Sequence, residues 1–253
     1  KSIKDLTYPN YEVVVIDNGS TDQSLERLKA IPNIKLVALP RNTGFTGGHI
    51  EGLKHSEGEY IALLNNDLAV DPEWLSALVA CAQENLADIV GGRSYEWDDS
   101  QPAFNTENSF SSYQVVSPVT GHTTMLKRGD KVTDANNLSG SNLLVSRRLI
   151  NSIGYLDASF FAYYEETDLI ARAKRAGFRA VYCPGARVWH KSGASSRNNP
   201  FFYFYQMHRN RFRFAYKNYD GPELRTFLNY YTKEMFGAVK RRSKSKNDHD
   251  SAM

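Results

Sequence analysis

The sequence has few cysteines, little net charge and no long apolar run. Its two cysteines, Cys81 and Cys183, have neither metal-ligand spacing nor the density of a disulfide framework, which indicates a reducing compartment. A formal net charge of +3 does not argue for nucleic acid as a partner. No apolar stretch approaches the length of a membrane span, and no signal peptide is visible. These absences favour a cytoplasmic globular protein.

What is present is a regular alternation of strand and helix patterns. A chain of 253 residues has room for one sizeable α/β domain with a small appendage. Short apolar stretches at residues 12–16, 34–39 and 60–64 alternate with segments of helical periodicity. This alternation predicts an α/β fold with a mostly parallel sheet that helices flank on both faces.

The most informative stretch runs from residue 60 to residue 67. Apolar residues stop abruptly at Asn65-Asn66-Asp67, which is typical of a buried strand that ends in polar side chains. In open α/β sheets, ligands bind at the carboxyl ends of the strands. A carboxylate there suits Mg²⁺ or Mn²⁺ carrying a diphosphate, because these cations prefer oxygen ligands. A plain turn is the alternative interpretation, since Asn and Asp are common in turns.

Two other loops follow strands in the same way. Asp17 ends the first strand and could accept hydrogen bonds from a base or ribose, although a helix-capping turn explains it as well. Arg41 opens a glycine-rich loop before a helix, where backbone N–H groups can approach a phosphate. The guanidinium group of Arg41 can add a bidentate, positively charged contact to such a phosphate site.

Two later stretches also carry candidate chemistry. Glu165, Glu166 and Asp168 open one helix, where acids are stabilising in any case, and Asp168 can pair with Arg172 at i,i+4. Flanking aromatic residues would desolvate an inward-facing carboxylate and raise its pKa, which makes a better general base. His190 follows an apolar strand, and it is either a structural residue or a neutral nitrogen ligand beside Asp67.

Taken in order, these motifs resemble family 2 glycosyltransferases of the GT-A fold, and within them the rhamnosyltransferase-like branch. The resemblance covers roughly residues 8–196. Its order is specific, although no single motif is decisive. The matching segments are Asp17-Asn18-Gly19-Ser20-Thr21-Asp22, Asn42-Thr43-Gly44-Phe45, Leu64-Asn65-Asn66-Asp67, Gly140-Ser141-Asn142, Tyr164-Glu165-Glu166-Thr167-Asp168-Leu169 and His190.

The resemblance implies an inverting transfer from a nucleotide-sugar donor. It implies that Asp17, Asn18, Arg41, Asn42 and Asn65 bind the donor, with Asp17 on the base. It also implies metal and catalytic residues, which are Asp67 and His190 for the metal and Glu165 and Glu166 for catalysis.

The sequence departs from the family pattern in two respects. Glu166 stands where the family usually has the aspartate base, and its side chain reaches one methylene further. The family also opens with a strand that supplies a wall of the nucleotide pocket, and this chain is expected to begin after that strand. If the strand is absent, donor binding would be impaired or lost.

We expect three parts: an N-terminally truncated GT-A domain at residues 1–198, an aromatic and basic helical extension at residues 199–239, and a disordered tail at residues 240–253. In the extension, aromatic residues alternate with arginines. That composition suits an acceptor site or a peripheral membrane contact, and a helix packed on the sheet with a solvated basic face is the alternative. The expected location of the protein is the cytoplasm, with the inner face of the membrane as the alternative.

The expected function is transfer of a sugar, with rhamnose as one candidate, to a hydroxyl of a glycan or lipid-linked acceptor. The donor would be linked to dTDP or UDP, and the cofactor would be Mg²⁺ or Mn²⁺. The alternative is a catalytically silent homologue that binds a sugar or a partner. A nucleotidyltransferase is disfavoured, because it would require a strongly basic glycine-rich loop after its first strand, and this sequence has no such loop there.

Overall fold

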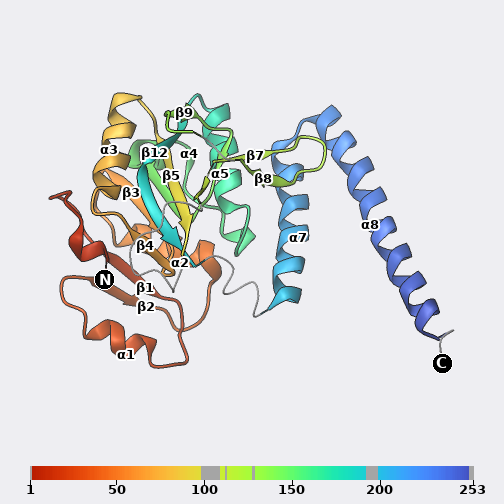
Figure 1. Ribbon diagram of the computed structural model, residues 1–253, viewed down its shortest axis with the longest axis horizontal. Helices are drawn as coiled ribbons and strands as arrows, with labels where there is room; N and C mark the ends of the chain where they lie inside the picture. The colour runs from red at the N-terminus through yellow and green to blue at the C-terminus, as the bar shows by residue number, and fades with distance from the viewer. Residues whose placement is uncertain (1, 98–108, 112, 127–128, 192–198, 251–253) are drawn as a thin grey trace.

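The fold is an α/β body with a helical hairpin beside it (Figure 1). The computed structural model describes residues 2–97, 109–111, 113–126, 129–191 and 199–250, and the side chains of residues 109–111 and 238–250 are not described. Among the residues described, no helix is both long enough and apolar enough to cross a membrane.

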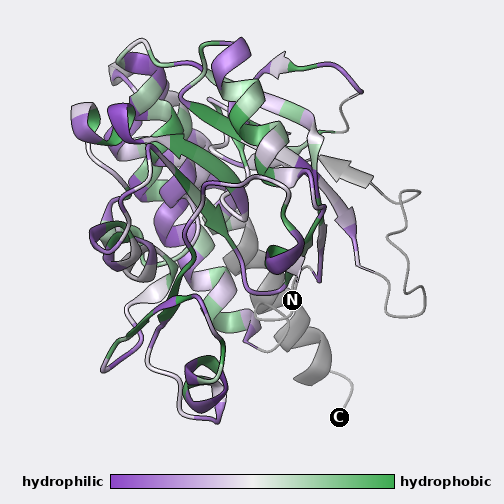
Figure 2. Cartoon of the chain, turned by 90° about the vertical axis from the view of Figure 1, so that its left-hand side faces the viewer, coloured by the Kyte–Doolittle hydropathy of each residue, from purple (hydrophilic) through white to green (hydrophobic). Residues whose placement is uncertain are grey.

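A seven-stranded sheet forms the centre of the body. The order of its five main strands is β3-β11-β5-β12-β4, with β6 paired to β5 and β9 paired to β12. Their bounds are β3 Tyr60–Leu64, β4 Leu68–Val70, β5 Ile89–Glu96, β6 Ser109–Ser111, β9 Thr133–Asp134, β11 Asn142–Ser146 and β12 Ala180–His190. Figure 2 shows hydrophobic strands crossing the middle of the body, in green, with hydrophilic purple on the surrounding helices.

The strand directions correct one expectation. The α/β class is confirmed, but the sheet is mixed, not mostly parallel. Within it, among the described strands, only β5 and β12 pair in parallel, and β11 is antiparallel to both β3 and β5. Where the structure describes the chain between β5 and β11, it returns through short strands and holds no crossover helix. As a result β11 enters the sheet in the opposite direction.

Helices cover both faces of this sheet because its strands alternate their side chains between two cores. Leu144 faces the core under α3 (Trp74–Glu84), whereas its neighbours Leu143 and Val145 face the core under α4 and α5. The bounds of these two helices are α4 Arg147–Ile153 and α5 Glu165–Arg175.

The N-terminal segment forms a separate two-stranded parallel sheet. It consists of β1 and β2, and α2 packs against β1. Here the close approach of a helix requires small residues, because a Cβ on Gly48 or Gly52 would already touch Ile16. The bounds are η1 Ser2–Asp5, β1 Val14–Asp17, α1 Ser24–Lys29, β2 Lys35–Ala38 and α2 Gly44–Lys54.

A small antiparallel sheet of three strands reaches toward the C-terminal helices (Figure 1). Its strand order is β10-β7-β8, with bounds β7 Tyr113–Val116, β8 Thr123–Met125 and β10 Asn137–Leu138.

The C-terminal extension is a helical hairpin of α7 (Pro200–Asn218) and α8 (Gly221–Asp250). The backbone of residues 240–250 is helical, whereas a disordered tail was expected there, and residues 251–253 lie outside the described part. Figure 1 shows α7 beside the body and α8 diverging from it toward the C-terminus.

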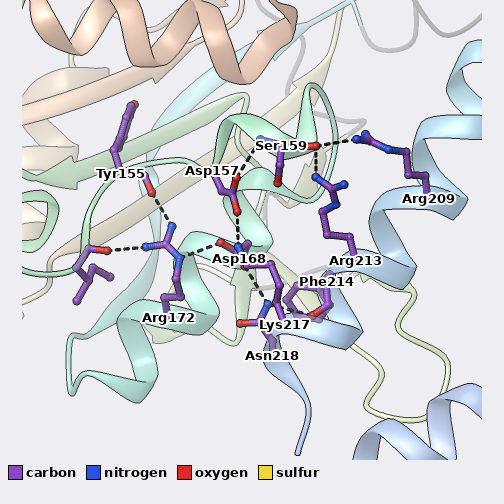
Figure 3. Close-up of polar contacts among 11 residues, drawn as sticks. Tyr155, Asp157, Ser159, Asp168, Arg172, Arg209, Arg213, Phe214, Lys217 and Asn218 are labelled. Carbon is purple, nitrogen blue, oxygen red and sulfur yellow. Dashed lines mark hydrogen bonds and ion pairs between the residues drawn. The ribbon is translucent and has the colours of Figure 1, made fainter.

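One buried carboxylate joins α7 to the body. Asp168 on α5 is fully buried, and its Oδ2 accepts a hydrogen bond from Arg172 at 2.8 Å, so the expected i,i+4 pair is confirmed. Its Oδ1 accepts from Asn218 at 2.9 Å and pairs with Lys217 at 3.0 Å (Figure 3). The extension is therefore held by charge as well as by packing.

Replacement of Asp168 by Ala should destabilise the protein strongly, because Arg172 and Lys217 would keep their charges without their shared partner. Breaking a buried pair in this way costs about 3–5 kcal/mol. Urea unfolding would measure the change in the free energy of unfolding. Asp5→Ala, at an exposed position, is the control and should change it by no more than about 0.5 kcal/mol. Equal effects of the two variants would contradict the assignment.

Candidate active site

Asp67 and His190 meet at one edge of the central sheet. Asp67 follows β3 and precedes β4, and β4 pairs antiparallel with the end of β12, so that Leu68 lies opposite His190. His190 Nε2 lies 3.0 Å from Asp67 Oδ1, although the residues are 123 positions apart in sequence. The Lys191 amide also donates to the Asp67 carbonyl at 3.0 Å. The expected proximity of the two side chains is confirmed, and their role as metal ligands stays a prediction.

The environment of Asp67 favours the ionised carboxylate. Burial alone would raise the Asp67 pKa, but the hydrogen bond and the charge of His190 outweigh it, so that the pKa lies below its usual value. An ionised carboxylate is the form that a hard divalent cation requires.

The donor set fits a cation that takes most of its ligands from elsewhere. Among the described residues there is no group of three or more His, Cys, Asp or Glu side chains that could hold a metal ion. One carboxylate and one imidazole are nevertheless enough for Mg²⁺ or Mn²⁺ when phosphate oxygens and water complete the shell. Asn65 Oδ1, which lies nearby in sequence, is buried without a hydrogen-bond partner in the described structure.

Asp17 has one carboxylate oxygen that a ligand could use. It ends β1 and is 4% exposed, and Oδ2 accepts from the Ser20 amide at 3.3 Å. Its Oδ1 is buried and has no hydrogen-bond partner among the described residues. A buried acceptor without a donor is costly, so this oxygen is suited to a ligand N–H or O–H.

Asn18 and Asn42 shape the loop before α2. Asn18 Oδ1 accepts from the Thr43 amide and hydroxyl, both at 2.9 Å, and its Nδ2 donates to the Gly44 carbonyl at 2.8 Å. Asn42 Oδ1 accepts from the Gly44 amide at 2.8 Å. Direct contact of either side chain with a donor stays a prediction.

The start of α2 corrects the expectation that its free amides would approach a phosphate. The amides of Thr43 and Gly44 are bonded to the two asparagines, and the Thr46 amide donates to the carbonyl of Phe161 at 3.0 Å. Three of the amides that could have met a phosphate are therefore used within the protein. Arg41 is exposed, and its backbone packs so closely on Gly19 that a Cβ there would lie 2.6 Å from it.

Glu165 and Glu166 open α5 as a pair of buried acids. Glu165 is 4% exposed, and Glu166 packs against the backbone of Gly140, where an added Cβ would lie 3.3 Å from the Glu166 Cβ. One oxygen of each carboxyl group is buried without a partner in the described structure. Each of these two oxygens could therefore accept a hydrogen bond from a ligand hydroxyl.

The surroundings shift the pKa values of Glu165 and Glu166 to different extents. Burial, and then the charge of Glu166, raises the pKa of Glu165 well above its usual value. Burial also raises the pKa of Glu166, but backbone N–H groups and the hydrogen bond from Glu165 oppose that rise. The pKa of Glu165 therefore lies further above its usual value than that of Glu166, which makes Glu165 the better hydrogen-bond donor of the pair and Glu166 the better acceptor.

Short contacts connect these groups across the body. The Asn65 amide donates to the Ser141 carbonyl at 3.3 Å, and the neighbouring Gly140 touches Glu166. Glu166 therefore touches the residue next to Ser141, and Ser141 binds the residue that follows β3.

Sequence reasoning missed the residues that hold this region together. They are Phe161, whose carbonyl caps α2, and Asn210, whose side chain bonds the loop before Glu165. The arginines of the extension were noticed in the sequence, but the contact of Asn210 with that loop depends on a long-range packing arrangement that no local pattern encodes.

The fold is that of the GT-A glycosyltransferases. The structure of GalNAc-T7 with UDP, GalNAc and Mn²⁺ superposes with a TM-score of 0.61 at 16% identity, and the match covers 75% of this chain and 39% of that one.

Residues 1–154 match the sequence model described as glycosyl transferase family 2, and the chain belongs to this family. Among curated relatives, N-acetylglucosaminyl-diphospho-decaprenol L-rhamnosyltransferase of Mycobacterium tuberculosis is 26% identical over 83% of this chain and 76% of its own length. The uncharacterized protein y4gI of Sinorhizobium fredii is 26% identical over 74% of this chain, which spans only 22% of that protein's length.

Replacement of Glu165 by Gln should stabilise the protein at neutral and alkaline pH. The pKa of Glu165 is higher in the folded state than in the unfolded state, where it is about 4.3. Below the unfolded-state pKa the carboxyl group is protonated in both states and costs no stability. As the pH rises from there toward the folded-state pKa, the unfolded state ionises first and the free energy of unfolding falls. Gln does not ionise, so the gain in Tm should be larger at about pH 8 than at about pH 4.5.

Thermal unfolding at the two pH values measures this difference. Glu73→Gln, at an exposed position just before α3, is the matched control and should give no such trend. A gain that increases on acidification would show that Glu165 is not destabilised by its surroundings.

Proposed function

We propose that the chain transfers a sugar, with inversion at the anomeric carbon, from a nucleotide-diphosphate donor to an acceptor hydroxyl. The observation that carries this proposal is the 3.0 Å contact between His190 and Asp67 at the ends of β12 and β3. It unites an ionised carboxylate and an imidazole at the strand ends, where α/β proteins bind ligands. The membership in glycosyl transferase family 2 supports it.

Asp67 and His190 would hold a divalent cation, Mg²⁺ or Mn²⁺. When bound, such a cation supplies positive charge that stabilises the diphosphate leaving group. Asp17 would receive a hydrogen bond from the base or ribose through its unpaired Oδ1, and Asn65 would contribute its buried Oδ1 to the same donor. Arg41, which is exposed beside this loop, would add positive charge.

Glu166 would act as the general base. Its carboxylate takes the proton of the acceptor hydroxyl while that oxygen forms a bond to the anomeric carbon on the face opposite the diphosphate. The bond between the anomeric carbon and the phosphate oxygen breaks, and the nucleoside diphosphate leaves. Glu165, which remains protonated, donates to Glu166 and orients its acceptor oxygen.

The finer choices of donor and acceptor rest on relatives and on α7. The Mycobacterium tuberculosis relative is named as a rhamnosyltransferase that acts on a decaprenol-linked sugar, so we infer a deoxyhexose such as rhamnose, carried by dTDP or UDP, and a lipid-linked acceptor. Tyr163 packs edge-on against Tyr203 with centroids 5.2 Å apart, and Phe161 lies 5.9 Å from Phe202. These contacts bring the start of α7 to the loop that precedes the two acids.

The same end of α7 offers a surface for an apolar acceptor or for the membrane that holds it. Phe201 is 79% exposed, and Phe204 and Tyr205 are more than half exposed. Exposed aromatic side chains of this kind suit the interface of a lipid bilayer. A peripheral membrane contact through this end of α7 is therefore part of the proposal.

Replacement of Glu166 by Gln should lower kcat about 10²- to 10⁴-fold, because the isosteric amide cannot accept a proton. The KM of the donor should change by no more than about twofold, since the base acts on the acceptor. Release of the nucleoside diphosphate in the presence of Mn²⁺ measures both constants. Glu73→Gln is the control. A parallel loss of kcat and donor affinity would argue against a base role, and donor binding without any turnover in the unchanged chain would favour the silent module.

Replacement of Asp67 by Asn should weaken donor binding only in the presence of the cation. We expect the Kd of the nucleoside diphosphate with Mn²⁺ to rise about tenfold or more, which is about 1.4 kcal/mol. Calorimetric titrations with and without Mn²⁺ measure this difference, and Asp5→Asn, at an exposed position, is the control. Unchanged cation-dependent binding in Asp67→Asn would remove Asp67 from the site.

A further inference from the structure

The loop immediately before the two acids has an unfavourable backbone conformation. Phe161, Tyr163 and Tyr164 have φ values of +64°, +71° and +71°, in the left-handed region that non-glycine residues rarely adopt. Each such residue costs about 1–2 kcal/mol. Such a conformation persists only where the surroundings enforce it, and it is typical of functional sites.

This strained loop, residues 160–164, determines where the acids lie. Tyr164 is the capping residue of α5, so its backbone sets the direction in which Glu165 and Glu166 leave the loop. At its other end, the Phe161 carbonyl accepts from the Thr46 amide and lies where a Cβ on Gly44 would be, at 2.4 Å. The loop therefore connects the acids to the start of α2.

A single side chain from α7 holds the loop in this conformation. Asn210 is fully buried, and its Nδ2 lies 2.7 Å from the carbonyl oxygens of Phe160 and Ala162 and 2.9 Å from that of Tyr163. Two N–H groups thus serve three carbonyls that turn toward the same point. Relaxation of the loop would turn these carbonyls away and leave the amide buried without acceptors, which is costly.

Two arginines of α7 bind the residue just before this loop and so support the contacts of Asn210, which we call the Asn210 clamp. Arg209 and Arg213 both donate to the carbonyl of Ser159, at 3.0 and 2.5 Å (Figure 3). Arg209 also donates to Asn210 Oδ1 at 3.1 Å, which orients the amide so that its nitrogen faces the loop. The helix therefore contacts the loop through backbone carbonyls, and these contacts do not depend on the loop's own side chains.

We propose that Asn210 is a positioning residue for sugar transfer, and that it holds residues 160–164 in their strained conformation so that Glu166 faces the acceptor hydroxyl. This inference rests on the proposed role of Glu166. It assigns to α7 a part in the transfer step that is separate from any contact of its exposed aromatic residues with an acceptor or a membrane.

The test compares kcat with the KM of the donor in Asn210→Ala. We expect kcat to fall about tenfold or more while the donor KM stays within about twofold, because the loop orients the base and leaves Asp67 and His190 untouched. Asn151→Ala, at an exposed position on α4, is the matched control and should leave both constants unchanged. An unchanged kcat, or equal effects on kcat and KM, would overturn the proposal.

A second substitution separates the clamp from general packing. Glycine adopts positive φ without cost, so Tyr163→Gly in the Asn210→Ala background should let the loop keep its path without the amide. We expect the double variant to regain at least about threefold in kcat over Asn210→Ala. A double variant as slow as Asn210→Ala, or slower, would show that strain at Tyr163 is not what Asn210 restrains.

Two further measurements make the outcome decisive. If Asn210→Ala lacks cooperative thermal unfolding, Arg209→Ala is tested in its place, since Arg209 is only half-buried and orients the Asn210 amide through Oδ1. A loss confined to kcat supports the proposal, and no loss overturns it. Glu166→Gln is measured in parallel. Full activity of Glu166→Gln would overturn the base assignment and this inference with it, whereas an inactive Glu166→Gln beside a fully active Asn210→Ala would overturn this inference alone.

Discussion

The antiparallel pairing of β4 with the end of β12 is the constraint on which the site depends. It puts Leu68 opposite His190 and so brings the imidazole to Asp67 Oδ1. The pairing also explains the electrostatics, because the bond to His190 outweighs burial and keeps the Asp67 carboxyl ionised. The three-residue strand β4 thus brings together Asp67 and His190, neither of which indicates a site by its local sequence alone.

The two acids of α5 show how neighbours with the same chemistry acquire different states. Burial of the carboxyl groups raises the pKa of each, but only for Glu166 do several backbone N–H groups, at the helix start and at Gly140, oppose that rise. Two adjacent carboxylates in poorly solvated surroundings cannot both ionise at low cost, and the more strongly raised pKa of Glu165 makes it the acid that favours its proton. The arrangement provides one acceptor and one donor from two glutamates.

The C-terminal hairpin is tied to the body near the site and is more than an appendage. Asp168 binds Arg172 from its own helix and Lys217 and Asn218 from α7, and Asn210 from α7 binds the loop before Glu165. A second polar junction lies further along α7, where Arg211 is fully buried beside Glu234 of α8 and stacks on Tyr231 at 4.8 Å. Polar contacts therefore link α8 to α7, and α7 to the acids.

The sequence by itself determined the α/β class, the strand that ends at Asp67, the helix that begins with Glu165 and the family. These features depend on local patterns: an apolar run that stops at polar residues, acids at a helix start, and an order of short motifs. The pair of Asp168 with Arg172 was also predictable, because residues four apart on a helix face each other.

Only the tertiary structure decided the strand directions, the use of the α2 amides and the clamp on the loop before the acids. Each depends on partners far apart in sequence: β11 against β3, the Phe161 carbonyl against the Thr46 amide, and Asn210 against residues 160–163. Local periodicity carries no information about such partners, because a backbone amide or a buried asparagine finds its acceptor only when packing has brought the two segments together.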